Sequence, residues 1–122
     1  MATVSEFISV LRNSSPQVHI FHNQTRIYSE HIALGGYYDD VLDLIDRLTE
    51  TYTALYGEIE DYKSAPYKNY TSKDDTVVYF KTLYAYVQKN RSIFTDSFIQ
   101  NIIDELSELL AQTMFRLGLD EI

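Results

Sequence analysis

The 122-residue chain has 18 Asp and Glu against 10 Lys and Arg, a net charge of −8 at pH 7, and no Cys. This length predicts a single domain over residues 1–122, and the negative charge excludes nucleic acid and anionic membrane surfaces as expected partners. The lack of cysteine excludes disulfides and thiolate metal sites. Together with the lack of a signal pattern or a membrane-spanning apolar run, it favours a cytoplasmic protein.

Only two Pro and four Gly interrupt the chain, and apolar residues recur at three- and four-residue steps, which predicts an all-α protein. The first helix is expected over residues 4–23, opened by a capping box of Thr3 and Glu6 and broken at Pro16. A second, longer helix is expected over residues 29–62. Its apolar stripe comprises Leu34, Tyr38, Val41, Leu42, Ile45, Leu48, Tyr52, Leu55 and Ile59.

Two further helices are expected in the second half of the chain. Residues 76–87 have strand propensity, but their apolar side chains share one helical face and Ser72 is a suitable N-cap, so residues 74–90 are predicted as helix. The last helix, 95–118, ends at Gly118. Its stripe comprises Ile99, Ile102, Leu106, Leu109, Thr113 and Leu117. Four helices with mostly short connections predict an antiparallel four-helix bundle.

All three histidines lie within thirteen residues, at His19, His22 and His31, and a run of carboxylates follows them. Imidazole and carboxylate together are a ligand set for iron, manganese or zinc. A helical wheel at about 100° per residue places four of the carboxylates on one face, away from the apolar stripe. These are Asp39, Asp43, Asp46 and Glu50. This face is either simply solvated or faces a second copy with a metal between the two.

The spacing of these residues resembles that of the Dps miniferritins. In that family a His near the start of the second helix is followed after fifteen residues by an Asp and four residues later by a Glu, as His31, Asp46 and Glu50 are here. The family also has a His on its first helix. His19 has the family's twelve-residue interval, whereas His22 has the better local context and requires a three-residue deletion. The resemblance implies a ferritin-like fold with iron bound at a subunit interface.

The chain departs from the miniferritin pattern at one position, and it has a second resemblance to another group of proteins. The miniferritins have a further Asp four residues after the second His, where this chain has Gly35. Residues 19–56 are also similar to small uncharacterised tailed-phage proteins, through the segments His22-Asn23-Gln24-Thr25 and Ala33 to Asp39. This second resemblance implies no function.

Two functions follow from these patterns. The first is a reduced ferritin-like phage protein that binds a divalent metal at a helix or subunit interface, with a ferroxidase-like activity left open. The second is a non-enzymatic module whose acidic helical surface binds a host or phage protein. We expect no organic cofactor, because no glycine loop for phosphates is present. We expect at least a dimer, because Tyr-rich faces and the long second helix exceed what one thin bundle buries.

Overall fold

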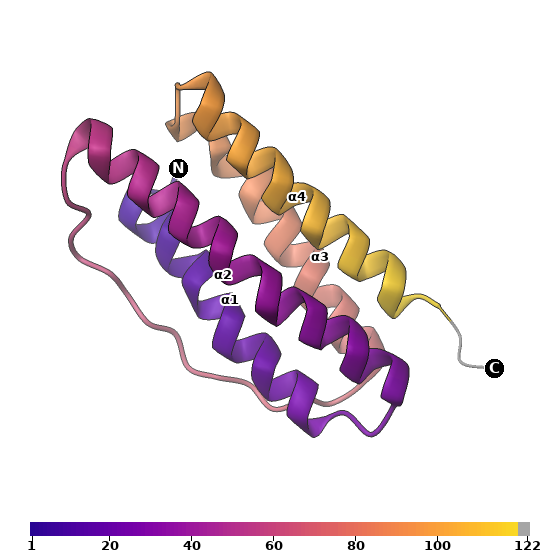
Figure 1. Ribbon diagram of the computed structural model, residues 1–122. Helices are drawn as coiled ribbons and strands as arrows, with labels where there is room; N and C mark the ends of the chain where they lie inside the picture. The colour runs from indigo at the N-terminus through magenta and orange to yellow at the C-terminus, as the bar shows by residue number, and fades with distance from the viewer. Residues whose placement is uncertain (120–122) are drawn as a thin grey trace.

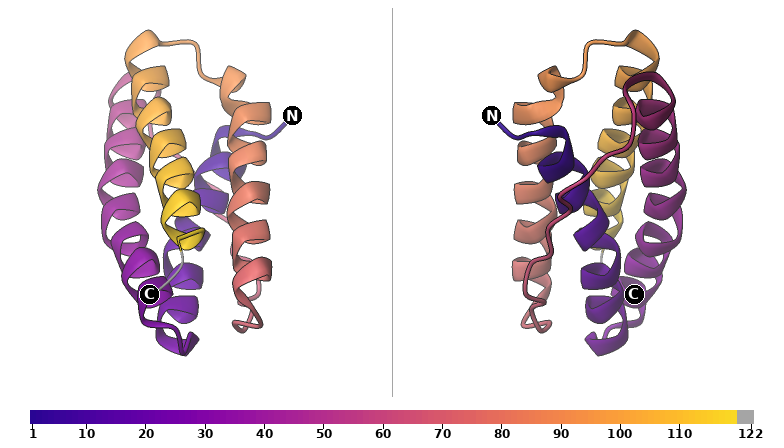
Figure 2. Two further views of the ribbon diagram at one scale, coloured as in Figure 1. Left: turned by 90° about the vertical axis from the view of Figure 1, so that its right-hand side faces the viewer. Right: turned by 90° about the vertical axis from the view of Figure 1, so that its left-hand side faces the viewer.

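The computed structural model describes residues 1–119, which form helices and connections without any strand. The elements are α1 (Val4–Gln24), α2 (Tyr28–Tyr56), α3 (Lys73–Asn90), the 3₁₀ turn η1 (Arg91–Ile93) and α4 (Ser97–Leu117). Helix α1 packs on α2, α2 on α4, and α4 on α3, and each of these pairs is antiparallel (Figures 1 and 2). The predicted all-α class and helical bundle are confirmed. No helix among residues 1–119 is long and apolar enough to cross a membrane.

The helix starts follow the predicted caps, but the predicted break at Pro16 is wrong. The Glu6 N–H donates to Thr3 Oγ1 at 3.2 Å, and the Thr3 N–H donates to Glu6 Oε1 at 3.3 Å, which completes the capping box. Helix α1 runs through Pro16 without interruption. Proline removes only the hydrogen bond to the carbonyl of Arg12, and Arg12 is exposed, so water can reach that part of the helix.

Helix α2 ends at Tyr56, six residues before the predicted end at residue 62. Gly57 has a φ of 96°, a left-handed conformation that glycine adopts without strain and that stops the helix. Ile59 nevertheless lies in the core, because the connection turns its side chain back onto the bundle. The predicted helix was too long because Ile59, which lies beyond the end of α2, is buried and continues the apolar stripe of that helix. The bounds of α3 and α4 lie within two residues of the predictions.

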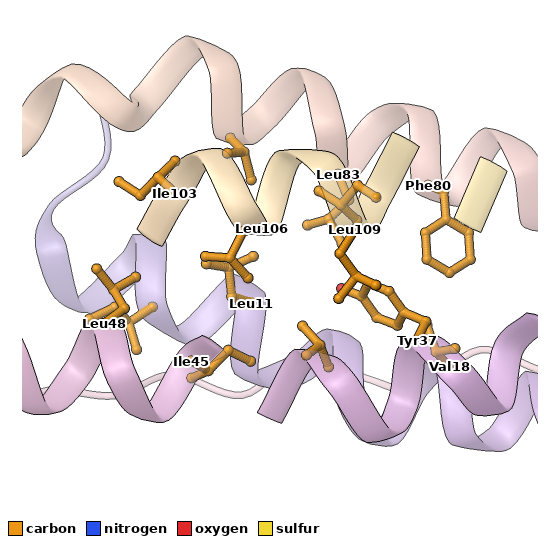
Figure 3. Packing of buried hydrophobic residues seen from close by; sticks show 14 of the residues in the cluster. Leu11, Val18, Tyr37, Ile45, Leu48, Phe80, Leu83, Ile103, Leu106 and Leu109 are labelled. Atoms are coloured by element: carbon orange, nitrogen blue, oxygen red, sulfur yellow. The ribbon is translucent and has the colours of Figure 1, made fainter. Parts of the chain in front are cut away.

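Side chains from all four helices form one apolar core, shown in part in Figure 3. The whole predicted stripe of α4 is buried, whereas the stripe of α2 is corrected at three positions. Leu42 and Leu55 are exposed, and Tyr37 rather than Tyr38 is fully buried. The two tyrosines lie on opposite borders of the wheel's apolar sector, so periodicity alone does not separate them.

The crossover, residues 57–72, returns the chain along the bundle so that α2 and α3 run in the same direction (Figure 1). Polar side chains of α1 hold it in place. The Lys63 N–H donates to Ser9 Oγ at 2.9 Å. Gln17 makes two bonds with the Lys68 backbone, accepting from its N–H at 2.7 Å and donating to its carbonyl at 2.9 Å. Gln24 accepts a third backbone N–H, near the end of the crossover. The crossover is thus fixed to α1 by hydrogen bonds along most of its length.

Candidate metal-binding residues

His22 on α1 and His31 on α2 form a reciprocal pair next to the short α1–α2 connection. Their rings stack with centroids 3.7 Å apart and an interplanar angle of 16°. His22 Nδ1 lies 2.6 Å from the His31 carbonyl oxygen, and His31 Nδ1 lies 2.7 Å from the His22 carbonyl oxygen. A carbonyl oxygen only accepts, so both Nδ1 atoms carry the proton. In the neutral rings both Nε2 atoms therefore keep a lone pair, and neither makes a hydrogen bond within residues 1–119.

Gly35 makes room for this pair. A Cβ added at Gly35 would lie 2.9 Å from Cε1 and 3.2 Å from Nδ1 of His22. These are closer than side-chain carbons pack, so any larger residue would displace the ring. This is the position at which the miniferritin pattern has a carboxylate.

His19 belongs to the same row of rings but lies outside the reciprocal pair. Its ring stacks on Tyr38 with centroids 4.2 Å apart, and its centroid lies 6.0 Å from that of His22. Tyr28 is at the other end of the row, 6.4 Å from the ring of His31. The structure thus brings all three predicted histidines together. It also adds two flanking tyrosines, Tyr28 and Tyr38, of which the sequence pattern singled out only Tyr38, as part of the apolar stripe.

Asp46 and Glu50 lie elsewhere on the bundle. Both are exposed, one turn apart on the outer side of α2, and neither has a hydrogen bond or ion pair within residues 1–119. Asp46 is fifteen residues beyond His31, about 22 Å along the helix. Within residues 1–119 no three His, Cys, Asp or Glu side chains lie close enough together to hold a metal ion. Within one chain the histidines therefore lie close to one another, and the two carboxylates lie close to each other at a different place on the bundle.

The acidic face of α2, Asp39, Asp43, Asp46 and Glu50, has little counter-charge. Arg47 is the one Lys or Arg in this helix, and its guanidinium pairs with Glu105 of α4 at 3.0 Å. Exposed apolar side chains lie on the same outer side of the helix, near its start and middle. They are Tyr28, Ile32 and Leu42. The outer side of α2 therefore combines uncompensated negative charge with apolar surface, a combination typical of an interaction site.

A buried carboxylate on the opposite side of α2 was not predicted. Glu30 is 1% exposed, and its Oε1 accepts from Tyr70 Oη at 2.6 Å and from Thr25 Oγ1 at 3.2 Å. Its Oε2 has no partner within residues 1–119. Burial and this bond raise the pKa of Tyr70. In sequence Glu30 resembles any acidic residue in the first turn of a helix, so nothing marked it as buried.

The fold and these residues define a small helical bundle with a pair of hydrogen-bonded histidines on its surface. The chain belongs to a family of unknown function, DUF5856, whose sequence profile matches residues 22–117. The matched range includes His22, His31, Asp46 and Glu50 and leaves His19 outside. No curated protein and no solved structure matches the chain.

Proposed function

We propose that this protein is a ferritin-like bundle in which two copies share a divalent-metal site. The ligands are the His22 and His31 side chains of one copy and the Asp46 and Glu50 side chains of the other. The reciprocal hydrogen bonds of the two histidines carry the proposal. Metal-binding histidines commonly donate the second ring N–H to a carbonyl or carboxylate, which fixes the tautomer and leaves the other nitrogen for the metal. Both rings already meet this condition.

The chain path supports the ferritin-like part of the proposal. Ferritin-like bundles have one long crossover connection, and their metal ligands project from facing helices. Here the one long connection is 57–72, and the helices on either side of it run in the same direction (Figure 1). Imidazole and carboxylate together suit iron, manganese and zinc, so the proposal covers these three ions. Oxidation of bound Fe(II) remains the activity that the resemblance to miniferritins implies.

A two-fold axis explains why the ligands are separated in one chain. If two α2 helices pack antiparallel with the axis near Asp39 and Asp40, His31 of each copy faces Asp46 and Glu50 of the other, which creates two equivalent sites. His19 is the substitute for His22 in this arrangement. The exposed apolar residues on the outer side of α2 provide the remaining contact. The resemblance to phage proteins adds the host bacterial cytoplasm as the proposed location.

Charge makes dimerisation dependent on the metal. Pairing two α2 helices brings their acidic faces together, and the carboxylates repel one another unless a cation lies between them. Added Fe(II), Mn(II) or Zn(II) should therefore convert monomer to dimer. By linkage it should also raise the melting temperature, because the ion binds only the folded state.

Calorimetry and light scattering on protein purified without an affinity tag test this proposal. We expect micromolar or tighter binding of at least one of the three ions, two ions per dimer, and a doubling of the mass. His31→Ala should abolish binding, and Glu50→Ala should weaken it at least tenfold. Glu108→Ala, an exposed change on α4, is the matched control and should bind as the unchanged protein does. Lack of micromolar binding, or binding that survives both substitutions, would falsify the proposal.

The uncompensated acidic face also favours a second candidate, a non-enzymatic module that binds a basic host or phage protein. Its carboxylates would then pair with lysines and arginines of the partner rather than with a metal. Replacing Asp43 and Asp46 by Asn would abolish such binding, whereas His31→Ala would leave it unchanged. Because Asp46 is also a proposed metal ligand, His31→Ala is the substitution that separates the two candidates.

A further inference from the structure

A cavity of about 930 Å³, open to solvent on one side, lies between α1, α3 and the crossover, on the side of α1 that faces away from α2. Helices α1 and α3 approach each other at few points, so their facing side chains leave this space between them. Ligand sites in proteins span roughly 300–1,000 Å³, and a space of this size would otherwise hold about thirty waters. Its apolar walls come from three elements. They include Val10, Phe21, Pro66, Tyr79 and Leu83.

The cavity is elongated along the bundle axis. On α1 its lining extends from Glu6 to Phe21, which is about 22 Å of helix. On α3 it extends from Asp75 to Tyr86, which is about 16 Å. This shape suits a single narrow chain rather than a compact ring system.

The carboxylates of the lining already serve local roles at its two ends. Glu6 accepts from Thr3 in the capping box of α1, and Asp75 Oδ2 accepts from Thr71 Oγ1 at 2.6 Å. They are therefore poorly placed to hold a cationic ligand along the middle of the cavity.

The hydrogen-bond donors of the lining, in contrast, are available. Within residues 1–119 the ammonium groups of Lys63 and Lys68 form no ion pair, although Lys63 is near enough to Glu6 to help lower the pKa of that carboxyl. The hydroxyls of Tyr79 and Tyr86, which also line the cavity, make no hydrogen bond within the same residues. Both hydroxyls are protonated at neutral pH and can donate. Burial raises the pKa of both tyrosines, and the nearby Glu6 carboxylate adds to the rise for Tyr86. Two cations and two hydroxyl donors beside apolar walls are complementary to a ligand with an anionic, accepting head and a hydrocarbon body.

We propose that this cavity binds a single-chain anionic amphiphile, a long-chain fatty acid. Its hydrocarbon chain lies lengthwise between α1 and α3, among Phe21, Tyr79 and Leu83. Its carboxylate lies at the crossover, beside Lys63 and Lys68. The site shares no residue with the proposed metal ligands, so either proposal can fail without the other.

Titration calorimetry with palmitate below its micelle concentration tests the binding. We expect one palmitate per chain with micromolar affinity. Shorter chains should bind about three- to fourfold more weakly for each methylene removed, because each methylene takes apolar surface out of water. Hexadecanol, which lacks the charge, and cetyltrimethylammonium, which has the opposite charge, should each bind at least tenfold more weakly than palmitate. No micromolar binding of palmitate, or equal binding of the cationic amphiphile, overturns the proposal.

Substitutions then locate the site. Lys63→Ala and Lys68→Ala should each weaken palmitate binding threefold or more, and the matched control Lys81→Ala, on α3 outside the cavity, should not change it. Val78→Trp places a large ring at the rim. Because Val78 is 56% exposed, we expect the variant to fold and to lose binding at least tenfold. Nuclear Overhauser contacts from the palmitate methylenes to the Tyr79 ring give the same information on the unchanged protein. Contacts confirm the site. Their absence, or unchanged binding in the three cavity variants, refutes it.

Discussion

Helix α1 packs in two different ways on its two sides. Toward α2 the contact is closed, because Leu11 and Val18 are fully buried (Figure 3). Ser14 also bonds to the Tyr37 hydroxyl at 2.8 Å. Toward α3 the contact is open, and the cavity lies between the helices. There the crossover is held to α1 by side-chain hydrogen bonds, with Gln17 as the doubly bonded residue.

The difference follows from how each contact is stabilised. The closed contact removes apolar surface from water, at about 25 cal/mol per Å². The same two helices hold the rings of His22 and His31, which stack and bond to each other's backbone carbonyls. The open contact depends on individual hydrogen bonds, each contributing about 1 kcal/mol net. Close packing suits a site that needs fixed ligand directions, and an open contact suits a site that needs volume. The two proposed sites match the two sides of α1.

Alkaline pH should have the largest effect, because Tyr37 on the closed side is fully buried and Tyr79 on the open side is partly buried. Burial raises the pKa of Tyr37 on the closed side and of Tyr79 on the open side. A raised pKa in the folded state stabilises the fold below the unfolded value, near pH 10, and this stabilisation is lost as pH rises further. Urea unfolding followed by circular dichroism should show the free energy of unfolding falling steeply above about pH 10.

Phenylalanine variants show how much of this pH dependence comes from the tyrosine on the closed side of α1 and how much from the tyrosine on the open side. Tyr37→Phe and Tyr79→Phe should each flatten the alkaline fall. At pH 7 only Tyr37→Phe should lower stability, by about 1 kcal/mol, because only its hydroxyl has a hydrogen bond to lose. Stability that stays constant up to about pH 11 would contradict the burial of both hydroxyls.

Gln17→Ala should have the next largest effect, by releasing the crossover on the open side. The substitution removes both bonds to the Lys68 backbone from a side chain that is 2% exposed, and it should cost about 2 kcal/mol. Limited proteolysis should then cut the segment 57–72 faster. Gln112→Ala, an exposed change on α4, is the matched control, with an expected change below about 0.5 kcal/mol. Equal changes in the two variants would show that these bonds do not hold the crossover.

The helices on both sides of α1 could mostly be predicted from local sequence, whereas the space between α1 and α3 could not. Caps such as Thr3 and Ser72 act within one turn, so the sequence contains the whole signal for them. The end of α2 was missed because the stripe continues to Ile59, although Gly57 stops the helix. The cavity depends on the spacing between α1 and α3, which are distant in sequence. The hydrophobic periodicity within either helix gives no information on the distance between the two helices.

The candidate metal site could also be predicted from the sequence only in part. The clustering of the histidines in sequence predicted His22 and His31 as candidate ligands of one site. In the structure a three-residue connection joins their helices, which brings the two rings together. Their reciprocal backbone bonds were not predicted, since these depend on how the two helices face each other. The contribution of Asp46 and Glu50 remains a prediction, because it requires a second copy of the chain.

A pair of glycine substitutions has the smallest expected effect and tests the closed side most directly. Replacing a glycine inside a helix by alanine normally stabilises the protein by up to about 1 kcal/mol, because alanine loses less backbone entropy on folding. At Gly36 the added Cβ would have its nearest neighbour, Arg116 Nη1, at 4.0 Å, so Gly36→Ala should show this gain. At Gly35 the Cβ would lie 2.9 Å from His22 Cε1, so the ring must move.

Moving that ring should cancel the gain at Gly35. The displaced His22 loses its bond to the His31 carbonyl and its stacking, and the released His31 loses the return bond. Two lost bonds at about 1 kcal/mol each outweigh the gain in helix propensity, so Gly35→Ala should be less stable than Gly36→Ala by about 2 kcal/mol in urea unfolding. In the same variant, and not in Gly36→Ala, the imidazole resonances of His22 and His31 should shift. Equal stability with unshifted resonances would mean that the pair tolerates a side chain beside it. The histidine geometry would then not be fixed by packing.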